Sequence, residues 1–419
     1  MAQTQIYSAI KSCRACGNQN LIDVVDLGDH YLSGVFPSKK EANLIPKVPL
    51  KLVKCEGKDC CELVQLSVSV NPKLMYGDNY GYRSGLNQSM VTHLRNKVSK
   101  IEQMLDLGED DTIIDIGSND CTTLKSYSNS KSNFIGIDPT GDKFKDFYPE
   151  NVQLVADFFP CEKLKNILKG NKASVITSFS MFYDLEAPVE FARTIRDYLN
   201  DEGIWIFEQS YLPFMLDSTS FDTICHEHLE YYDLKSVNYI CKSAGLKIID
   251  VEFNSVNGGS FSITSAKADS KHKEYHLLED LMTKEDKYRS PQAFKNFRDK
   301  IKKAKIAMRD FLNNALIRGD KVMGIGASTK GNTLLQYFNI SSNMLPEIGE
   351  INTEKVGKTT PGTGIKITTE KSIIEKKPDY LLILPWHFSE FFKKSCNFKG
   401  FKLVFPLPEF TIFNSESDQ

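Results

Sequence analysis

The chain has 419 residues, enough for two or three domains, and its 41% hydrophobic and 25% charged residues are ordinary for a globular protein. The formal net charge of −2 gives no reason to expect nucleic acid or an anionic membrane surface as a partner. No run approaches the roughly 18 apolar residues of a membrane span, and the first residues lack a signal-peptide pattern, so we expect a cytoplasmic protein.

Cysteines gather near the start of the chain, where five of the ten lie in the first 61 residues. "CRACG" supplies Cys13 and Cys16, and "KCEGKDCCELVQL" supplies Cys55 and then either Cys60 or Cys61. Four thiolates at such spacings predict a tetrahedral, structural zinc site in a domain over 1–76. We prefer Cys61 as the fourth ligand, because the segment after it resembles a strand leaving the knuckle.

Residues 77–270 predict an α/β domain. Apolar spacing near 3.6 predicts a helix over 90–107, and strands are expected at 112–117, 133–138, 173–178 and 203–209, with a helix beginning at 121. The loop after the first strand has a single glycine, Gly117, so it suits a diphosphate poorly. Asp115 before the turn and Asp138 after the second strand instead favour S-adenosylmethionine, a cationic ligand with ribose hydroxyls.

Residues 271–419 predict a helical linker followed by a second α/β domain. An apolar stripe predicts one long helix, made of Phe294, Phe297, Ile301, Ala304, Met308 and Phe311. "KVMGIGASTKGNTLLQYF" then predicts strand, turn and helix. Its glycines and Lys330 favour an anion such as a phosphate at the helix start. Two lobes, each with a ligand feature, predict a site in the cleft between them.

The segment "CHEHLEYY" concentrates acid/base groups. It is not a zinc-peptidase motif, because the residue four positions after His226 is Glu230 rather than His. The N-terminal cysteines explain a metal better, so we interpret this run as an acid/base cluster facing the second lobe.

Several motifs in order resemble a known family: the double Cys knuckle, "DIGSND", "GIDPT", "CHEHLEYY", "NSVNGGSF", "GIGASTKGNTLLQYF" and "VGKTTPGTGIKI". The chain resembles the nucleotide-sugar C-methyltransferases of bacterial deoxysugar pathways over nearly its whole length. The resemblance implies an N-terminal zinc domain, a central class I (Rossmann-like) methyltransferase domain and a C-terminal Rossmann-like domain that binds a nucleotide sugar. It also implies methyl transfer from S-adenosylmethionine to C-3 of a 4-keto-deoxysugar linked to dTDP or GDP.

The resemblance also implies roles for individual residues. His228 would be the base that removes the C-3 proton, and the other catalytic residues would be His226, Glu227 and Tyr82. The cofactor pocket would contain Asp115, Gly117, Asn119, Asp138, Asp157 and Tyr80. Substrate contacts would come from Asn257, Gly258, Lys330, Asn332, Trp386 and His387.

Three positions depart from the family pattern: Cys225 replaces a Tyr, Tyr183 lies where a His is common, and Cys121 replaces a Gly. The first two predict a different keto-sugar rather than loss of function. Methylation of a sugar oxygen or another small metabolite is the alternative activity, and a binding module without activity is a third reading. A monomer is compatible with the sequence, which does not determine the oligomeric state.

Overall fold

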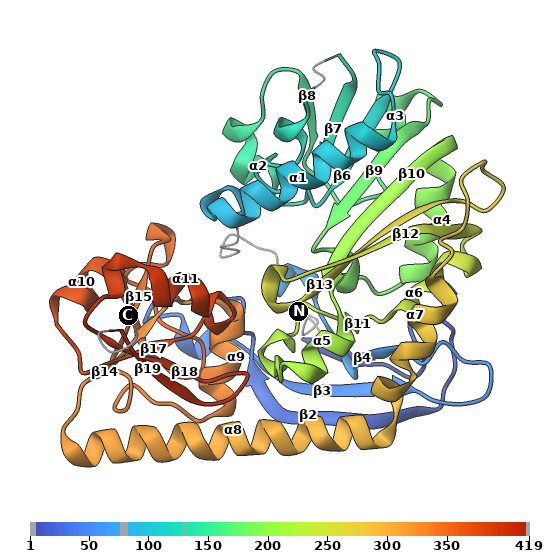
Figure 1. Ribbon diagram of the computed structural model, residues 1–419. Coiled ribbons are helices and arrows are strands. Elements are labelled where there is room, and N and C mark those ends of the chain that lie inside the picture. Colours follow the sequence, from blue (N-terminus) through green and yellow to red (C-terminus); the bar gives the residue numbers. More distant parts are fainter. Residues whose placement is uncertain (1–5, 76–82, 129–130, 416–419) are drawn as a thin grey trace, which may run out of the picture.

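The structure is a computed structural model that describes residues 6–75, 83–128 and 131–415. The central domain forms the upper lobe in Figure 1 and the C-terminal domain the left lobe, with the N-terminal strands below and between them. The long helix α8 (Pro291–Arg318) runs along the lower side and joins the parts.

The N-terminal domain is built on an antiparallel sheet whose four strands follow the order β11-β4-β3-β2. Burial alternates along the start of β3 and becomes continuous toward its end, where the strand approaches the cysteines. A separate pair, β1-β5, completes the domain. The strands are β1 (Tyr7–Ala9), β2 (Leu21–Tyr31), β3 (Lys47–Cys55), β4 (Val64–Leu66), β5 (Val68–Val70) and β11 (Glu230–Tyr231).

The central sheet has seven strands in the order β12-β13-β10-β9-β6-β7-β8, and β13 runs antiparallel to both neighbours. Strand β6 is buried along its whole length, as expected when helices cover both faces of a parallel sheet. Its carboxyl end lies between β7 and β9, where the strand order reverses and α/β sheets bind ligands. The strands are β6 (Thr112–Ile116), β7 (Asn133–Ile137), β8 (Val152–Val155), β9 (Ala173–Phe179), β10 (Leu199–Ser210), β12 (Leu246–Asn254) and β13 (Ser260–Lys267).

Helices α1 to α6 belong to this domain, and α1 confirms the helix predicted over 90–107. Their bounds are α1 (Gln88–Met104), α2 (Gly141–Phe144), α3 (Glu162–Leu168), α4 (Pro188–Tyr198), α5 (Leu212–Asp217) and α6 (Leu234–Ser243). The helix predicted to begin at residue 121 is wrong, because the chain there forms only a 3₁₀ turn over Leu124–Ser126. Asn119 and Cys121 have positive φ angles, and the Thr122 hydroxyl donates to Asp120, so local contacts replace a helical first turn.

The C-terminal sheet has the order β16-β15-β14-β17-β18-β19, and all its strands except β19 are parallel. This is the predicted second α/β domain. Its elements are β14 (Val322–Ile325), α9 (Thr329–Tyr337), β15 (Glu347–Glu350), β16 (Lys366–Thr369), α10 (Glu370–Glu375), β17 (Tyr380–Ile383), α11 (Ser389–Lys394), β18 (Lys402–Phe405) and β19 (Thr411–Asn414).

Helix α8 follows the shorter α7 (Leu278–Glu285) and buries the predicted apolar stripe. One hydrophobic core joins this stripe to N-terminal strands and to the C-terminal sheet, and a second core joins the N-terminal cysteines to the central sheet. The N-terminal domain is therefore packed against both others. Among the helices of the described residues, none combines the length and apolar character needed to cross a membrane.

Candidate functional site

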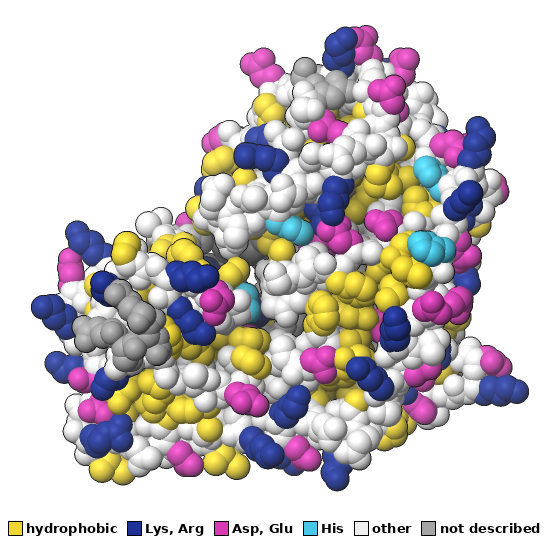
Figure 2. Space-filling view, viewed as in Figure 1, with side chains coloured by type: hydrophobic (Ala, Val, Ile, Leu, Met, Phe, Trp, Pro, Cys, Tyr) yellow, Lys and Arg dark blue, Asp and Glu magenta, His cyan; other side chains and the backbone are white. Residues whose placement is uncertain are grey.

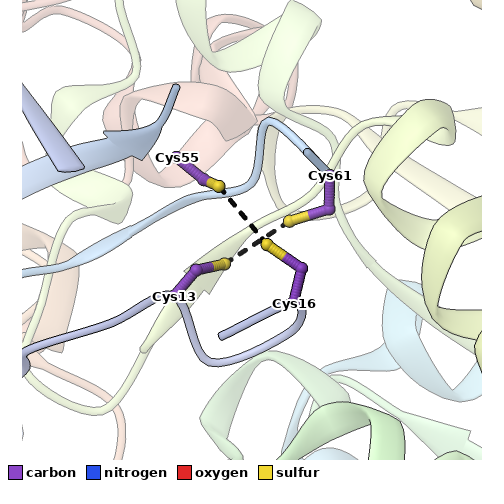
Figure 3. A group of neighbouring side chains, drawn as sticks. All are labelled: Cys13, Cys16, Cys55 and Cys61. Carbon is purple, nitrogen blue, oxygen red and sulfur yellow. Dashed lines mark hydrogen bonds between the residues drawn. The ribbon is translucent and has the colours of Figure 1, made fainter. Parts of the chain in front are cut away.

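The four predicted zinc ligands converge in the structure. The sulfur atoms of Cys13, Cys16, Cys55 and Cys61 all lie within 4.8 Å of one another, and Figure 3 shows them pointing to a common centre. The Cys13–Cys61 and Cys16–Cys55 sulfurs are 3.4 and 3.5 Å apart. Tetrahedral zinc with Zn–S bonds of about 2.3 Å places sulfurs about 3.8 Å apart, so the site fits zinc with a small expansion.

Cys60 lies outside this group. Its thiol is directed at the backbone carbonyl oxygens of Cys55 and Gly57, at 3.7 and 3.3 Å. The positive φ of Glu62 just after Cys61 turns the chain from the knuckle into β4, which begins at Val64. This arrangement supports the preference for Cys61 over Cys60.

At the carboxyl end of β6, Asp115 is buried and accepts a hydrogen bond from Thr177 Oγ1 at 2.6 Å. Burial raises the pKa of Asp115 to about 7, although hydrogen bonds from Thr177 and Thr123 oppose the rise. Gly117 has a φ of 76°, which favours glycine, and a Cβ there would lie 3.1 Å from the Met181 side chain. Glycine therefore allows this turn to pass beside Met181 without backbone strain.

Asp138 follows the end of β7 and is held over the same loop. One carboxylate oxygen accepts from the Asn119 backbone N–H at 2.9 Å, and the other accepts from the Thr140 N–H and hydroxyl. A carboxylate fixed at this edge fits a ribose acceptor. Asp157 is exposed just past β8 at the same sheet edge. These acidic groups fit the hydroxyls and cationic centre of S-adenosylmethionine. Tyr80 and Tyr82 lie outside the described residues.

His228 lies in the loop between the central sheet and β11, and it is only partly buried. Its Nδ1 is 2.9 Å from the Thr223 carbonyl oxygen, which only accepts, so Nδ1 carries the proton and Nε2 is the basic nitrogen. The Tyr183 ring packs against the imidazole with centroids 4.1 Å apart. Burial and, second, the Lys330 ammonium lower the pKa of His228 to about 3.

His226 and Glu227 contact the N-terminal domain. His226 is fully buried, its Nε2 is 3.2 Å from the Val48 carbonyl oxygen, and burial lowers its pKa to about 4. Glu227 packs against Gly34, where a Cβ would lie 1.9 Å from its Oε1. Burial raises the pKa of the Glu227 carboxyl. The structure therefore separates the two histidines, with only His228 contacting Tyr183 and lying near Lys330.

Lys330, in the first turn of α9, joins the C-terminal domain to the central one. Its Nζ donates to the Asn257 carbonyl oxygen at 2.6 Å, and burial lowers its pKa while Asp222 opposes the shift. Next to it, a Cβ on Gly258 would lie 3.5 Å from the His387 Cβ. The face shown in Figure 2 is hollowed between the upper and left lobes.

Two further predicted substrate residues make specific contacts within the protein. Trp386 Nε1 donates to Asp222 Oδ2 at 2.8 Å, which ties the end of β17 to the segment leading to His228. Asn332 is buried and donates from Nδ2 to the Ser33 carbonyl oxygen at 2.6 Å. Asn332 thus contacts the N-terminal domain rather than the Lys330 neighbourhood.

Family profiles match three successive parts of the chain: a zinc-binding domain over 13–76, a methyltransferase domain over 90–251 and a C-methyltransferase C-terminal domain over 255–408. The C-methyltransferase NovU of Streptomyces niveus is 26% identical over 419 residues, covering 98% of this chain and 99% of that protein. These matches together support an S-adenosylmethionine-dependent C-methyltransferase similar to NovU.

Solved structures are similar to part of this C-methyltransferase. One is a Haloferax volcanii complex of a methyltransferase with its activator Trm112. The match covers 44% of this chain and 94% of the matched chain, with 12% sequence identity and a TM-score of 0.36. The CcbJ methyltransferase of Streptomyces caelestis matches 42% of the chain and 90% of its own, at 11% identity and a TM-score of 0.34.

The domains define the cofactors of this C-methyltransferase. It uses S-adenosylmethionine as methyl donor, and it binds zinc through its N-terminal domain. Sequence reasoning missed Asp222, the buried partner of Trp386, and Gly34, the neighbour of Glu227. The sequence carries no signal for either, because each contact joins residues far apart in the chain.

Proposed function

We propose that this C-methyltransferase methylates C-3 of a nucleotide-linked 4-keto-deoxysugar, with His228 as the base. The observation that carries the proposal is that Lys330, which bonds to the central domain at Asn257, lies within electrostatic reach of both His228 and His387. His387 and His228 each have a pKa lowered by burial and by Lys330, which gives two neutral imidazoles around one cation.

A carbon next to a ketone becomes nucleophilic only after its proton is removed. The Thr223 carbonyl fixes the tautomer of His228 that leaves Nε2 able to accept that proton. S-adenosylmethionine, when bound, supplies an electrophilic methyl group. Tyr183 limits rotation of the imidazole, so the base stays aimed at one position.

Lys330 has two roles in this proposal. As a buried cation it attracts the negative charge of a nucleotide diphosphate. Since its charge also lowers the pKa of His228, an anionic substrate beside Lys330 raises that pKa on binding. His228 thus becomes a stronger base only when the substrate is in place.

The test is deuterium exchange at the proposed carbon. The enzyme is incubated in D2O with a dTDP- or GDP-linked 4-keto-deoxysugar but without methyl donor, and mass spectrometry follows incorporation at C-3. We expect exchange without donor, and a mass gain of one methyl group when donor is added.

Two neighbouring histidines give matched variants. His228→Asn should lose both exchange and methylation while still binding S-adenosylmethionine in calorimetry. His226→Asn should lower thermal stability, because it removes the Val48 contact, but retain exchange. Loss of exchange in the His226 variant alone would show that the base is misassigned, and an O-methyl product without exchange would refute C-methylation of the sugar.

A further inference from the structure

Arg14 lies inside the zinc knuckle, between Cys13 and Cys16, and its side chain is only 3% exposed. Its guanidinium contacts the strands that follow the second knuckle, β4 and β5. Nη1 donates to the Leu66 carbonyl oxygen at 2.7 Å, and Nη2 donates to the Val68 carbonyl oxygen at 3.0 Å. The knuckle is thereby fixed to the end of β4 and the start of β5.

The same guanidinium meets two carboxylates from the methyltransferase domain. Arg14 Nε is 3.4 Å from Glu186 Oε2 and 3.9 Å from Glu230 Oε1. Glu230 is fully buried, and neither carboxylate oxygen has a hydrogen-bond donor among the described residues. Burial raises the pKa of Glu230 well above its ordinary value, and the positive charge of Arg14 opposes this rise, so Arg14 is the cation that favours the carboxylate form of Glu230.

Each of these carboxylates lies a few residues from a residue of the proposed site. Glu230 is two residues after His228, and Glu186 is three residues after Tyr183, whose ring packs on His228. The two segments are also joined directly, because the Leu229 N–H donates to the Tyr183 carbonyl oxygen at 2.7 Å.

The connection to the N-terminal sheet is made by β11. Glu230 pairs with Gln65 and Tyr231 with Val64, so the chain leaving His228 becomes the edge strand of that sheet. Gln65 Oε1 in turn accepts from the Arg14 backbone N–H at 3.0 Å. A continuous set of contacts thus runs from the zinc knuckle to the histidine.

We propose that Arg14 is a positioning residue that couples the zinc knuckle to the placement of His228 and Tyr183 through Glu230 and Glu186. The assignment of His228 as the base rests on the function proposed above, but the coupling itself does not. Zinc fixes the turn that carries Arg14, and Arg14 fixes the two segments that face the substrate.

The primary variant is Arg14→Met, which keeps the length of the side chain and removes its charge. We expect elemental analysis to give one zinc ion per chain, as in the wild type. The affinity for S-adenosylmethionine should also be unchanged. The value of kcat should fall by about tenfold to a hundredfold with little change in KM, because the base is misplaced rather than the substrate released. Adding Glu230→Gln should restore part of the loss, since a neutral amide at this position does not depend on the Arg14 cation.

Hydrogen exchange read by mass spectrometry gives a measurement independent of substrate. Amides of 226–233 should exchange on the order of tenfold faster in Arg14→Met, because the variant removes the guanidinium contacts to Glu230 and Glu186 that hold this segment and the Tyr183 segment against the knuckle. Arg298→Met is the matched control: Arg298 Nη1 donates to the Val24 carbonyl oxygen and joins α8 to β2 away from His228. This control should leave exchange over 226–233 and kcat unchanged.

Should Arg14→Met fail to fold, zinc removal from the wild-type enzyme with a chelator provides the deciding measurement. If zinc removal speeds amide exchange both in 7–70 and in 226–233, the coupling is supported. If it speeds exchange in 7–70 alone, the coupling is overturned. Unchanged kcat and unchanged exchange in zinc-loaded Arg14→Met overturn it as well. Failure of the sugar assay in the wild type refutes the proposed function but leaves these exchange results interpretable.

Discussion

The close approach of Gly34 to Glu227 makes Gly34→Ala a sharp test of the site. A Cβ on Gly34 would lie 1.9 Å from Glu227 Oε1, 3.0 Å from its Cδ and 3.6 Å from Thr329 Oγ1. Ordinary van der Waals contact begins at 3.4 Å, so the carboxylate oxygen must move by about 1.5 Å. Misplacement of a catalytic side chain by about 1 Å lowers kcat by about a hundredfold. We therefore expect a loss of at least this size in kcat for Gly34→Ala if the Glu227 carboxylate takes part in turnover.

The expected cost in stability is small by comparison. The overlapping atom is the end of a flexible side chain, and the backbone of Gly34 does not have a positive φ. We therefore expect the free energy of unfolding to fall by about 1 kcal/mol, the low end of the range for overpacking. Steady-state methylation measures the effect on kcat, titration with S-adenosylmethionine measures its affinity, and thermal denaturation measures the effect on stability. Gly108→Ala is the control, because the nearest atom to its added Cβ is 3.9 Å away. Wild-type kcat in Gly34→Ala would refute a role for the Glu227 carboxylate in turnover.

Three further outcomes follow from the site. Cys61→Ser should lose zinc and native fold in elemental analysis and circular dichroism, whereas Cys60→Ser should retain both, because its thiol lies outside the sulfur cluster. Lys330→Met should move the acidic limb of the kcat/KM profile to higher pH, because removing the cation raises the pKa of His228 and the neutral base is the active form; an unmoved limb would contradict this. Acid should also destabilise the fold. The folded pKa of His226 is about 4 against about 6.5 unfolded, so unfolding at pH 5 should cost about 2 kcal/mol less than at pH 7, and His226→Asn should flatten that dependence in denaturant titrations.

Much of the fold was predictable because its signals are local. Buried apolar runs such as 112–116 mark strands of a parallel sheet, and the spacing of Phe294 to Phe311 marks one face of α8. The cysteine spacing likewise predicts that the sulfur atoms of Cys13, Cys16 and Cys55 converge with a fourth, and the strand-like segment after Cys61 favours it over Cys60. The helix expected from residue 121 was wrong because left-handed residues and side-chain hydrogen bonds, rather than periodicity, decide that turn.

The candidate site was only partly predictable. The sequence indicated that His228 faces the lobe that carries Lys330, but not that the Lys330 charge lies close enough to lower the pKa of His228. Only the family resemblance selected His228 over His226 as the base. Residue type and spacing did not, since the two histidines differ in their contacts with Val48 and Thr223, which form only in the folded chain. Pairings such as Asp222 with Trp386 join residues 164 positions apart and leave no local pattern.

The pairing of β11 with β4 also has a consequence for biosynthesis. Strand β4 is complete once residue 66 has been synthesised, but its partner at Glu230–Tyr231 emerges more than 160 residues later. Until then the backbone groups of β4 that later pair with β11 are unpaired, which is the condition that favours strand addition between chains. Nascent chains and fragments that end near Met75 should therefore associate through this edge, and an exogenous peptide covering 226–233 should suppress that association. The enzyme completes its four-stranded N-terminal sheet only after the segment that carries its proposed base has left the ribosome.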